Sequence, residues 1–193
     1  IIFLMLILVI FGNWIYLNKL EKDFEHSLRL RDVRIVNQEQ LYECKIDSLL
    51  NTIDELKTTF DSIPTGIPLD TLVIQDDYGV RRHPIFGRWQ MHSGIDMIDS
   101  WHDTVYATAS GTVRFSGWNY GYGRCVEIEH AFSFTTKYAH LHRIFVKKDE
   151  NIVKGQAIGM MGSTGDVTGP HLHYEISHDG QTIDPMPYIN CKP

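Results

Sequence analysis

Glycine and proline are both absent between Gly12 and Pro64. Fourteen of the 15 glycines and all seven prolines lie at or after Pro64. Because these two residues interrupt helices most strongly, the sequence predicts a helical first third, followed by a turn-rich and mainly β region. A chain of 193 residues has room for one domain with an additional segment, or for two small domains.

Cysteine is also scarce, and the 18 basic residues are outnumbered by 24 acidic ones. The three cysteines, Cys44, Cys125 and Cys191, form no C-x-x-C motif, which excludes the disulfide framework of a small secreted domain. A single bridge between Cys125 and Cys191 is one alternative, and buried or free thiols are the favoured one. The formal net charge of −6 argues against a nucleic-acid partner, because nucleic-acid binders carry a basic patch.

The first residues contain no charged side chain. Residues 1–17 read IIFLMLILVIFGNWIYL, and a helix needs ~20 apolar residues to cross a bilayer core of roughly 30 Å. Trp14 and Tyr16 fit the aromatic belt at a membrane interface. A cleaved signal peptide ends in a small-residue site, but this chain continues NKLEKDFEHSLRL. We therefore expect residues 1–17 to form an uncleaved transmembrane signal anchor rather than a buried core helix.

Residues 18–63 are predicted to form a helical stalk. Its C-terminal half places Ile46, Leu49, Ile53 and Leu56 at alternating spacings of three and four, an apolar seam of about two heptads. Two alternatives follow. The stalk is a coiled coil that forms a homodimer or binds a protein partner, or it is an amphipathic helix that packs on the next domain. Residues 64–75 are expected to form a linker.

From residue 76 to the end, short β-branched and aromatic runs alternate with glycine. This pattern predicts an antiparallel β domain over residues 76–193. Nine of the ten histidines lie here, which suggests metal or acid–base chemistry. Four of them lie beside turns or at an expected surface and are predicted to be solvated: His102, His130, His142 and His178.

Three histidine motifs stand out. In M-H-S-G-I-D, an extended segment places His92 and Asp96 on one side, and imidazole with carboxylate suits zinc. In P-H-L-H-Y-E-I, His171 and His173 share one face of a strand. In Y-A-H-L-H, His140 shares a strand face with the following histidine, and only one of the two needs a function.

Together and in this order, the motifs resemble those of the lysostaphin/LytM-type zinc metallopeptidases, which cut peptide bonds in bacterial peptidoglycan. The resemblance covers about residues 76–188 and includes the flanking G-V-R-R-H-P and G-S-T-G sequences. It implies a mainly β catalytic domain with an antiparallel sheet, also called a duplicated hybrid motif. It also implies that His92, Asp96 and His173 bind one Zn²⁺, and that His140 and His171 are the catalytic pair.

The chemistry of the residues agrees with this resemblance. A catalytic zinc has three protein ligands and one open position, whereas a structural zinc is closed by four. Since the sequence has no H-E-x-x-H motif, a histidine must accept the proton of the attacking water. We assign His171 as the base and His140 as the oxyanion stabiliser, and the reverse assignment fits the sequence as well. Further candidates for the substrate cleft are His83, Tyr138 and Thr168.

The predicted function is a membrane-anchored zinc metalloendopeptidase that hydrolyses peptidoglycan stem peptides or cross-links. The domain is expected on the periplasmic or extracytoplasmic side of the cytoplasmic membrane, because its substrate lies there. The alternative is a non-catalytic scaffold of the same fold, or an activator of cell-wall amidases, acting in cell division or envelope assembly. Such proteins have typically lost metal ligands. Here all five key positions are filled, which favours an enzyme.

Overall fold

A computed structural model describes residues 2–82, 87–100 and 102–189. The chain divides into two compact units, residues 1–55 and residues 56–193. Helix α1 (Ile2–Asp61) runs through the first unit and into the beginning of the second as one helix of 60 residues. Its continuity follows from the absence of helix-breaking residues, since Gly12 is its only glycine and it contains no proline.

The N-terminal part of α1 is apolar. By length and composition the helix is able to cross a membrane, a property that signal sequences share. Side chains such as Leu8 and Ile10 are more than half exposed.

The C-terminal end of α1 belongs to the second unit. The Asp61 carbonyl accepts a hydrogen bond from the Ser110 backbone N–H at 2.6 Å. The Lys154 ammonium lies 4.6 Å from the centre of the Phe60 ring, and Ile63 packs against the hydrophobic core. These contacts fix the last turn of the helix on the β domain.

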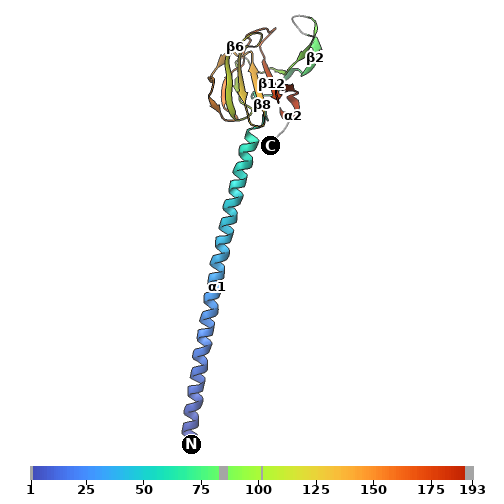
Figure 1. The fold of residues 1–193 in the computed structure, drawn as a ribbon. Coiled ribbons are helices and arrows are strands. Elements are labelled where there is room, and N and C mark those ends of the chain that lie inside the picture. The colour runs from blue at the N-terminus through green and yellow to red at the C-terminus, as the bar shows by residue number, and fades with distance from the viewer. Residues whose placement is uncertain (1, 83–86, 101, 190–193) are drawn as a thin grey trace. The chain divides into compact units, whose positions relative to one another are not determined.

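The second unit is a β domain in which the named strand pairings are antiparallel. The strands of its largest sheet follow the order β1-β4-β12-β8-β7-β6-β10, and β13 also pairs with β12. Figure 1 labels β6, β8 and β12 of this sheet. A three-stranded sheet has the order β5-β11-β9, and β2 pairs with β3. The predicted antiparallel β architecture is therefore confirmed.

The described strands and the short C-terminal helix have these bounds: β1 (Ile74–Asp76), β2 (Gly79–Arg82), β3 (Trp89–His92), β4 (Ile95–Met97), β5 (Thr104–Tyr106), β6 (Gly111–Asn119), β7 (Gly123–Glu129), β8 (Phe134–Ala139), β9 (Arg143–Ile144), β10 (Asn151–Ile152), β11 (Ala157–Met160), β12 (Leu172–His178), β13 (Gln181–Ile183) and α2 (Met186–Ile189).

Strand β12 separates the hydrophobic core from the polar face of the sheet. Leu172, Tyr174 and Ile176 are fully buried members of the core. Because side chains alternate along a strand, His173 and Glu175 point to the opposite face. The sequence H-L-H-Y-E-I thus supplies core residues and polar residues in turn.

The register of β12 brings distant motifs together. Asp96 on β4 pairs with His173, and Ala139 on β8 pairs with His173 from the other side. Gly94 permits the close approach of β4, because a Cβ atom there would lie 2.3 Å from the Tyr174 carbonyl oxygen. The three histidine motifs therefore meet at one place in the sheet.

Candidate active site

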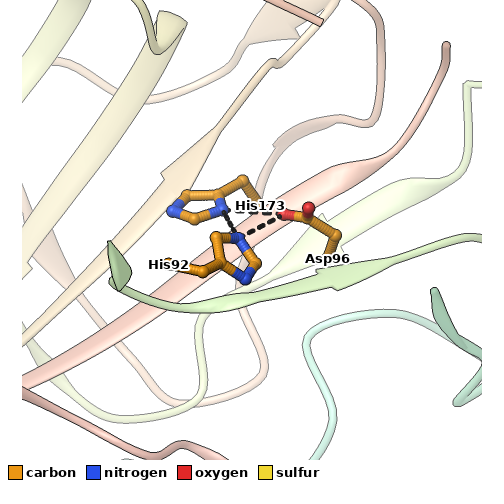
Figure 2. Close-up of side chains that lie close together, drawn as sticks. All are labelled: His92, Asp96 and His173. Atoms are coloured by element: carbon orange, nitrogen blue, oxygen red, sulfur yellow. Dashed lines mark hydrogen bonds and ion pairs between the residues drawn. The ribbon is translucent and has the colours of Figure 1, made fainter. Parts of the chain in front are cut away.

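Three buried side chains converge where β3, β4 and β12 meet. His173 Nδ1 lies 2.8 Å from Asp96 Oδ1. His92 Nε2 lies 3.1 Å from the same oxygen and 3.1 Å from His173 Nδ1. Figure 2 shows the two imidazole rings and the carboxylate pointing toward one another. Each residue is less than a tenth exposed.

Hydrogen bonds on the far side of each ring fix which nitrogen is directed at this centre. His92 Nδ1 lies 2.7 Å from the Asp77 carbonyl oxygen, which can only accept a hydrogen bond. His173 Nε2 lies 3.0 Å from Glu175 Oε1, also an acceptor. Both protons therefore lie on the outer nitrogens, which leaves lone pairs on His92 Nε2 and His173 Nδ1 for a cation.

This donor set fits zinc. Two imidazole nitrogens and one carboxylate oxygen are ordinary zinc ligands, and three protein ligands leave the open position of a catalytic site. The ligand atoms lie within 4.8 Å of one another. These three atoms would hold the ion if it is bound.

The electrostatics also favour a cation. Burial raises the pKa of Asp96, but the hydrogen bonds and charges of His173 and His92 outweigh this effect and lower it. Burial lowers the pKa of His173, but the hydrogen bonds and charges of Asp96 and Glu175 outweigh it, so that the pKa is raised. Both shifts show that the site favours a positive charge next to the Asp96 carboxylate.

His140 and His171 lie beside these three residues. Their ring centroids are 4.7 Å apart, and His171 Nε2 is 3.7 Å from Asp96 Oδ1. His140 Nδ1 lies 2.8 Å from the Thr164 carbonyl oxygen and His171 Nδ1 lies 2.9 Å from the Gly169 carbonyl oxygen. Since carbonyl oxygens only accept, the neutral form of each ring has an acceptor Nε2.

Burial favours the neutral form of both rings. It lowers the pKa of His140 to about 4, with a smaller contribution from the charge of His171. It also lowers the pKa of His171, while the Asp96 carboxylate opposes the shift. The backbone of His140 is held at a φ of 62°, a conformation that non-glycine residues rarely adopt and that is concentrated at active sites.

The loop before β12 supports His140. Gly165, at a φ of 86°, lies so near the turn between β6 and β7 that a Cβ atom would be 2.5 Å from the Gly121 carbonyl oxygen. Glycine therefore lets the loop present the Thr164 carbonyl to His140. This explains the second glycine of the G-S-T-G sequence in structural terms.

An open cleft borders the histidines and the aspartate. Thr168, predicted as a cleft residue, lines it together with Gln75, Gln90, Met91 and Tyr122. The prediction for Tyr138 is corrected: its ring is fully buried, and its hydroxyl accepts a hydrogen bond from the Thr108 backbone N–H.

Two further predictions about histidines have different outcomes. His83 lies outside the described residues. His130 was expected to be solvated, but it is 6% exposed and its two ring nitrogens lie within 3 Å of Ser110 O and Thr136 Oγ1. Cys125 is buried. Cys191 lies outside the described residues, so the favoured alternative of free thiols and the alternative of a bridge between the two both stay predictions.

Sequence reasoning gave no role to two charged neighbours of Asp96 and His173. Arg81 on β2 donates from its guanidinium to Asp96 Oδ2 at 2.9 Å and to Asp76 Oδ2 at 2.9 Å. Glu175 accepts from His173 Nε2. Strand alternation already places Glu175 on the face of His173, so this contact was accessible from the sequence, whereas the Arg81 contact depends on how β2 and β4 are brought together.

Fold and site together define an antiparallel β domain in which two histidines and one aspartate are close enough to hold one metal ion. The model of peptidase family M23 matches residues 90–185. The chain is 43% identical over 124 residues to the DD-carboxypeptidase/endopeptidase Mpg of Neisseria meningitidis, which corresponds to 63% of this chain and 29% of that protein. It thus spans less than a third of the length of that relative.

Two solved structures are similar as well. A zinc-containing peptidase from Vibrio cholerae is 34% identical with a TM-score of 0.58, over 66% of this chain and 39% of that one. The catalytic domain of lysostaphin from Staphylococcus simulans is 32% identical with a TM-score of 0.55, over 61% of this chain and 91% of that one. The chain belongs to peptidase family M23. The expected cofactor, Zn²⁺, agrees with this membership and with the donor set.

Proposed function

We propose that the chain is a membrane-anchored zinc metalloendopeptidase that hydrolyses peptide bonds of peptidoglycan. The observation that carries the proposal is the convergence of five buried residues on the edge of one cleft: His92, Asp96 and His173 as metal ligands, with His140 and His171 beside them. Bound zinc supplies Lewis-acid chemistry, which activates water and polarises a carbonyl group.

His171 is proposed as the general base. Its Nδ1–H is directed at the Gly169 carbonyl, so its Nε2 accepts the proton of the attacking water. The imidazolium that forms has the Asp96 carboxylate 3.7 Å away, which stabilises the positive charge. His171 then returns the proton to the leaving amine, and the proton balance of amide hydrolysis is closed.

His140 is proposed as the second catalytic histidine. Its hydrogen bond to Thr164 leaves Nε2 without a proton while the ring is neutral. A neutral His140 therefore orients water by accepting a hydrogen bond, and it stabilises an oxyanion only as the imidazolium. Thr168, on the cleft wall, is proposed to contact the substrate.

The substrate proposal follows the relatives. The Neisseria protein is named a DD-carboxypeptidase/endopeptidase, and we extend this to a cross-link between D-amino acids in peptidoglycan. An open cleft admits a peptide branch, and its Gln75 and Gln90 offer hydrogen bonds to backbone amides.

The proposed organisation assigns residues 1–17 to a transmembrane anchor, 18–63 to a stalk, 64–75 to a linker and 76–193 to the catalytic domain. The apolar beginning of α1 supports the anchor. Since peptidoglycan lies outside the cytoplasmic membrane, the catalytic domain is placed on the extracytoplasmic side. The apolar seam of the stalk supports pairing with a second copy or with a protein partner.

The test uses the full chain in detergent micelles, loaded with one equivalent of Zn²⁺ and incubated with purified peptidoglycan. Released fragments are identified by mass spectrometry, with His173→Ala as the control. New peptide termini that require His173 support the proposal and identify the bond that is cut. Intact peptidoglycan, with zinc bound and the chain folded, would instead favour a scaffold or an activator of amidases.

A further inference from the structure

Glu175 is a buried carboxylate next to the proposed metal ligands. It lies on β12, two residues after His173, and is 3% exposed. Its Oε1 atom lies 3.0 Å from His173 Nε2. In Figure 2 this second nitrogen of His173 points away from Asp96. Glu175 therefore contacts the ring nitrogen of His173 that faces away from the other proposed ligands, and it is not itself one of the three proposed ligands.

The surroundings of Glu175 fix its position and its charge. Oε1 accepts hydrogen bonds from the hydroxyls of Ser93 and Tyr122, the latter at 2.9 Å. Oε2 lies 3.1 Å from Lys137 Nζ, which also lies 3.4 Å from Glu127 Oε1 and 4.1 Å from the centre of the Tyr122 ring. A buried carboxylate with this many partners is held in one orientation.

We infer that Glu175 is a positioning residue for the metal: it binds the Nε2 proton of His173 and thereby directs the lone pair of Nδ1 toward the ion. The inference rests on the proposed function of this site as a zinc centre. A carboxylate that is paired with Lys137 can only accept, so His173 must donate to it from Nε2. The neutral ring then has its free electron pair on Nδ1, the atom that faces His92 and Asp96.

The carboxylate also makes His173 a stronger donor. A hydrogen bond to an anion increases the electron density of the imidazole, and loss of such an outer partner typically weakens metal binding by about 10- to 100-fold. The corresponding partner of His92 is the neutral carbonyl of Asp77, which no side-chain substitution removes. Of the hydrogen bonds on the far side of the two histidine ligands, only the one between Glu175 and His173 can therefore be removed by a side-chain substitution.

The experiment compares Glu175→Gln with Glu127→Gln in the full chain in detergent micelles. Both changes neutralise a carboxylate that contacts Lys137, but only Glu175 contacts His173. Zinc affinity is measured by competition with a chromophoric chelator, and the chain loaded with Co²⁺ is compared by visible absorption. Circular dichroism and thermal unfolding of the metal-free variants show whether each one folds.

We expect Glu175→Gln to raise the dissociation constant for Zn²⁺ by about 10- to 100-fold and to shift the Co²⁺ absorption bands. Glu127→Gln should leave both unchanged, even where it lowers the melting temperature. Equal zinc affinity in wild type and Glu175→Gln overturns the inference alone. Equal weakening by the two variants also overturns it, because the effect then comes from the ion pairs of Lys137. A wild-type chain that binds no Zn²⁺ overturns the proposed function.

Discussion

His130 and His171 are both buried, but their ring nitrogens meet different surroundings. His130 lies in a closed polar cluster, with Nδ1 2.9 Å from Ser110 O and Nε2 2.8 Å from Thr136 Oγ1. His171 uses Nδ1 in the same way, at 2.9 Å from Gly169 O, but its Nε2 faces the cleft beside Asp96. Both ring nitrogens of His130 therefore have hydrogen-bond partners within the fold, whereas Nε2 of His171 is directed at the cleft.

The polar cluster around His130 extends through a series of hydroxyl groups. The Thr136 hydroxyl lies 3.2 Å from the Tyr138 hydroxyl. The Thr108 hydroxyl in turn lies 3.0 Å from that of Tyr138 and 2.7 Å from that of Tyr174. Burial lowers the pKa of both histidines. A lowered pKa and burial therefore do not separate a catalytic histidine from a structural one. What separates them is that Nε2 of His171 faces the cleft beside Asp96, whereas both nitrogens of His130 are hydrogen-bonded within the fold.

The largest expected effect separates metal ligands from all other histidines. His92→Ala removes one of three ligands and leaves Asp96 and His173 to hold the ion, so zinc binding and peptidoglycan hydrolysis should fall to background. Zinc content by atomic absorption and fragment release by mass spectrometry measure the change. A His92→Ala chain that keeps stoichiometric zinc would exclude His92 as a ligand.

The next effect separates His171 from the ligands. His171→Ala should retain zinc and lose about 10²- to 10⁴-fold in kcat, the contribution typical of a general base. His140→Ala should also retain zinc, and the variant with the smaller loss identifies the residue that orients the water. Zinc titration and steady-state kinetics test both. Full turnover by His171→Ala would show that the base is another residue.

The third effect is on stability alone. His130→Phe leaves the Ser110 carbonyl and the Thr136 hydroxyl without their present partner, which should lower the free energy of unfolding by about 1–3 kcal/mol. Zinc affinity and kcat of the folded chain should not change. Chemical denaturation and kinetics on the same preparation measure these quantities, and a selective loss of kcat would connect the polar cluster to catalysis.

The smallest effect concerns pH. Burial lowers the pKa of His130 in the folded chain, so below the ordinary value of about 6.5 the unfolded chain binds a proton first. The free energy of unfolding should therefore fall as the pH falls below that value, and it should be unaffected by this group above it. His130→Phe should reduce the slope by up to about 1.4 kcal/mol per pH unit. Denaturation of the metal-free chains between pH 7 and pH 5 tests this, and identical slopes would contradict it.

Much of the fold was accessible from local patterns. The absence of helix breakers before Pro64 predicts a long helix, which the structure confirms as α1. The short runs punctuated by glycine predict antiparallel strands, because glycine supplies the turns and β-branched residues fill the pleated surface. The proposed domain boundaries stay a prediction, since a change in composition does not locate a domain by itself.

The sequence alone determined which residue types are available to the site and which of them share a strand face. The spacing of His171 and His173 follows from the period of two along a strand, and this period also separates them from the buried Leu172 and Tyr174. The burial of His130 and Tyr138 could not be predicted in this way, because it depends on strands that are distant in the sequence.

Only the tertiary structure decided which nitrogen of each histidine is free. The register between β4 and β12 sets Asp96 against His173, and the carbonyls of Asp77, Thr164 and Gly169 fix the protons of their histidine partners. These acceptors are backbone carbonyl oxygens on loops. Since every residue has such an oxygen, the residue types in the sequence do not show which ones accept these hydrogen bonds. The physical reason is that a local pattern specifies the direction of a side chain, whereas its hydrogen-bond partner depends on how distant segments pack.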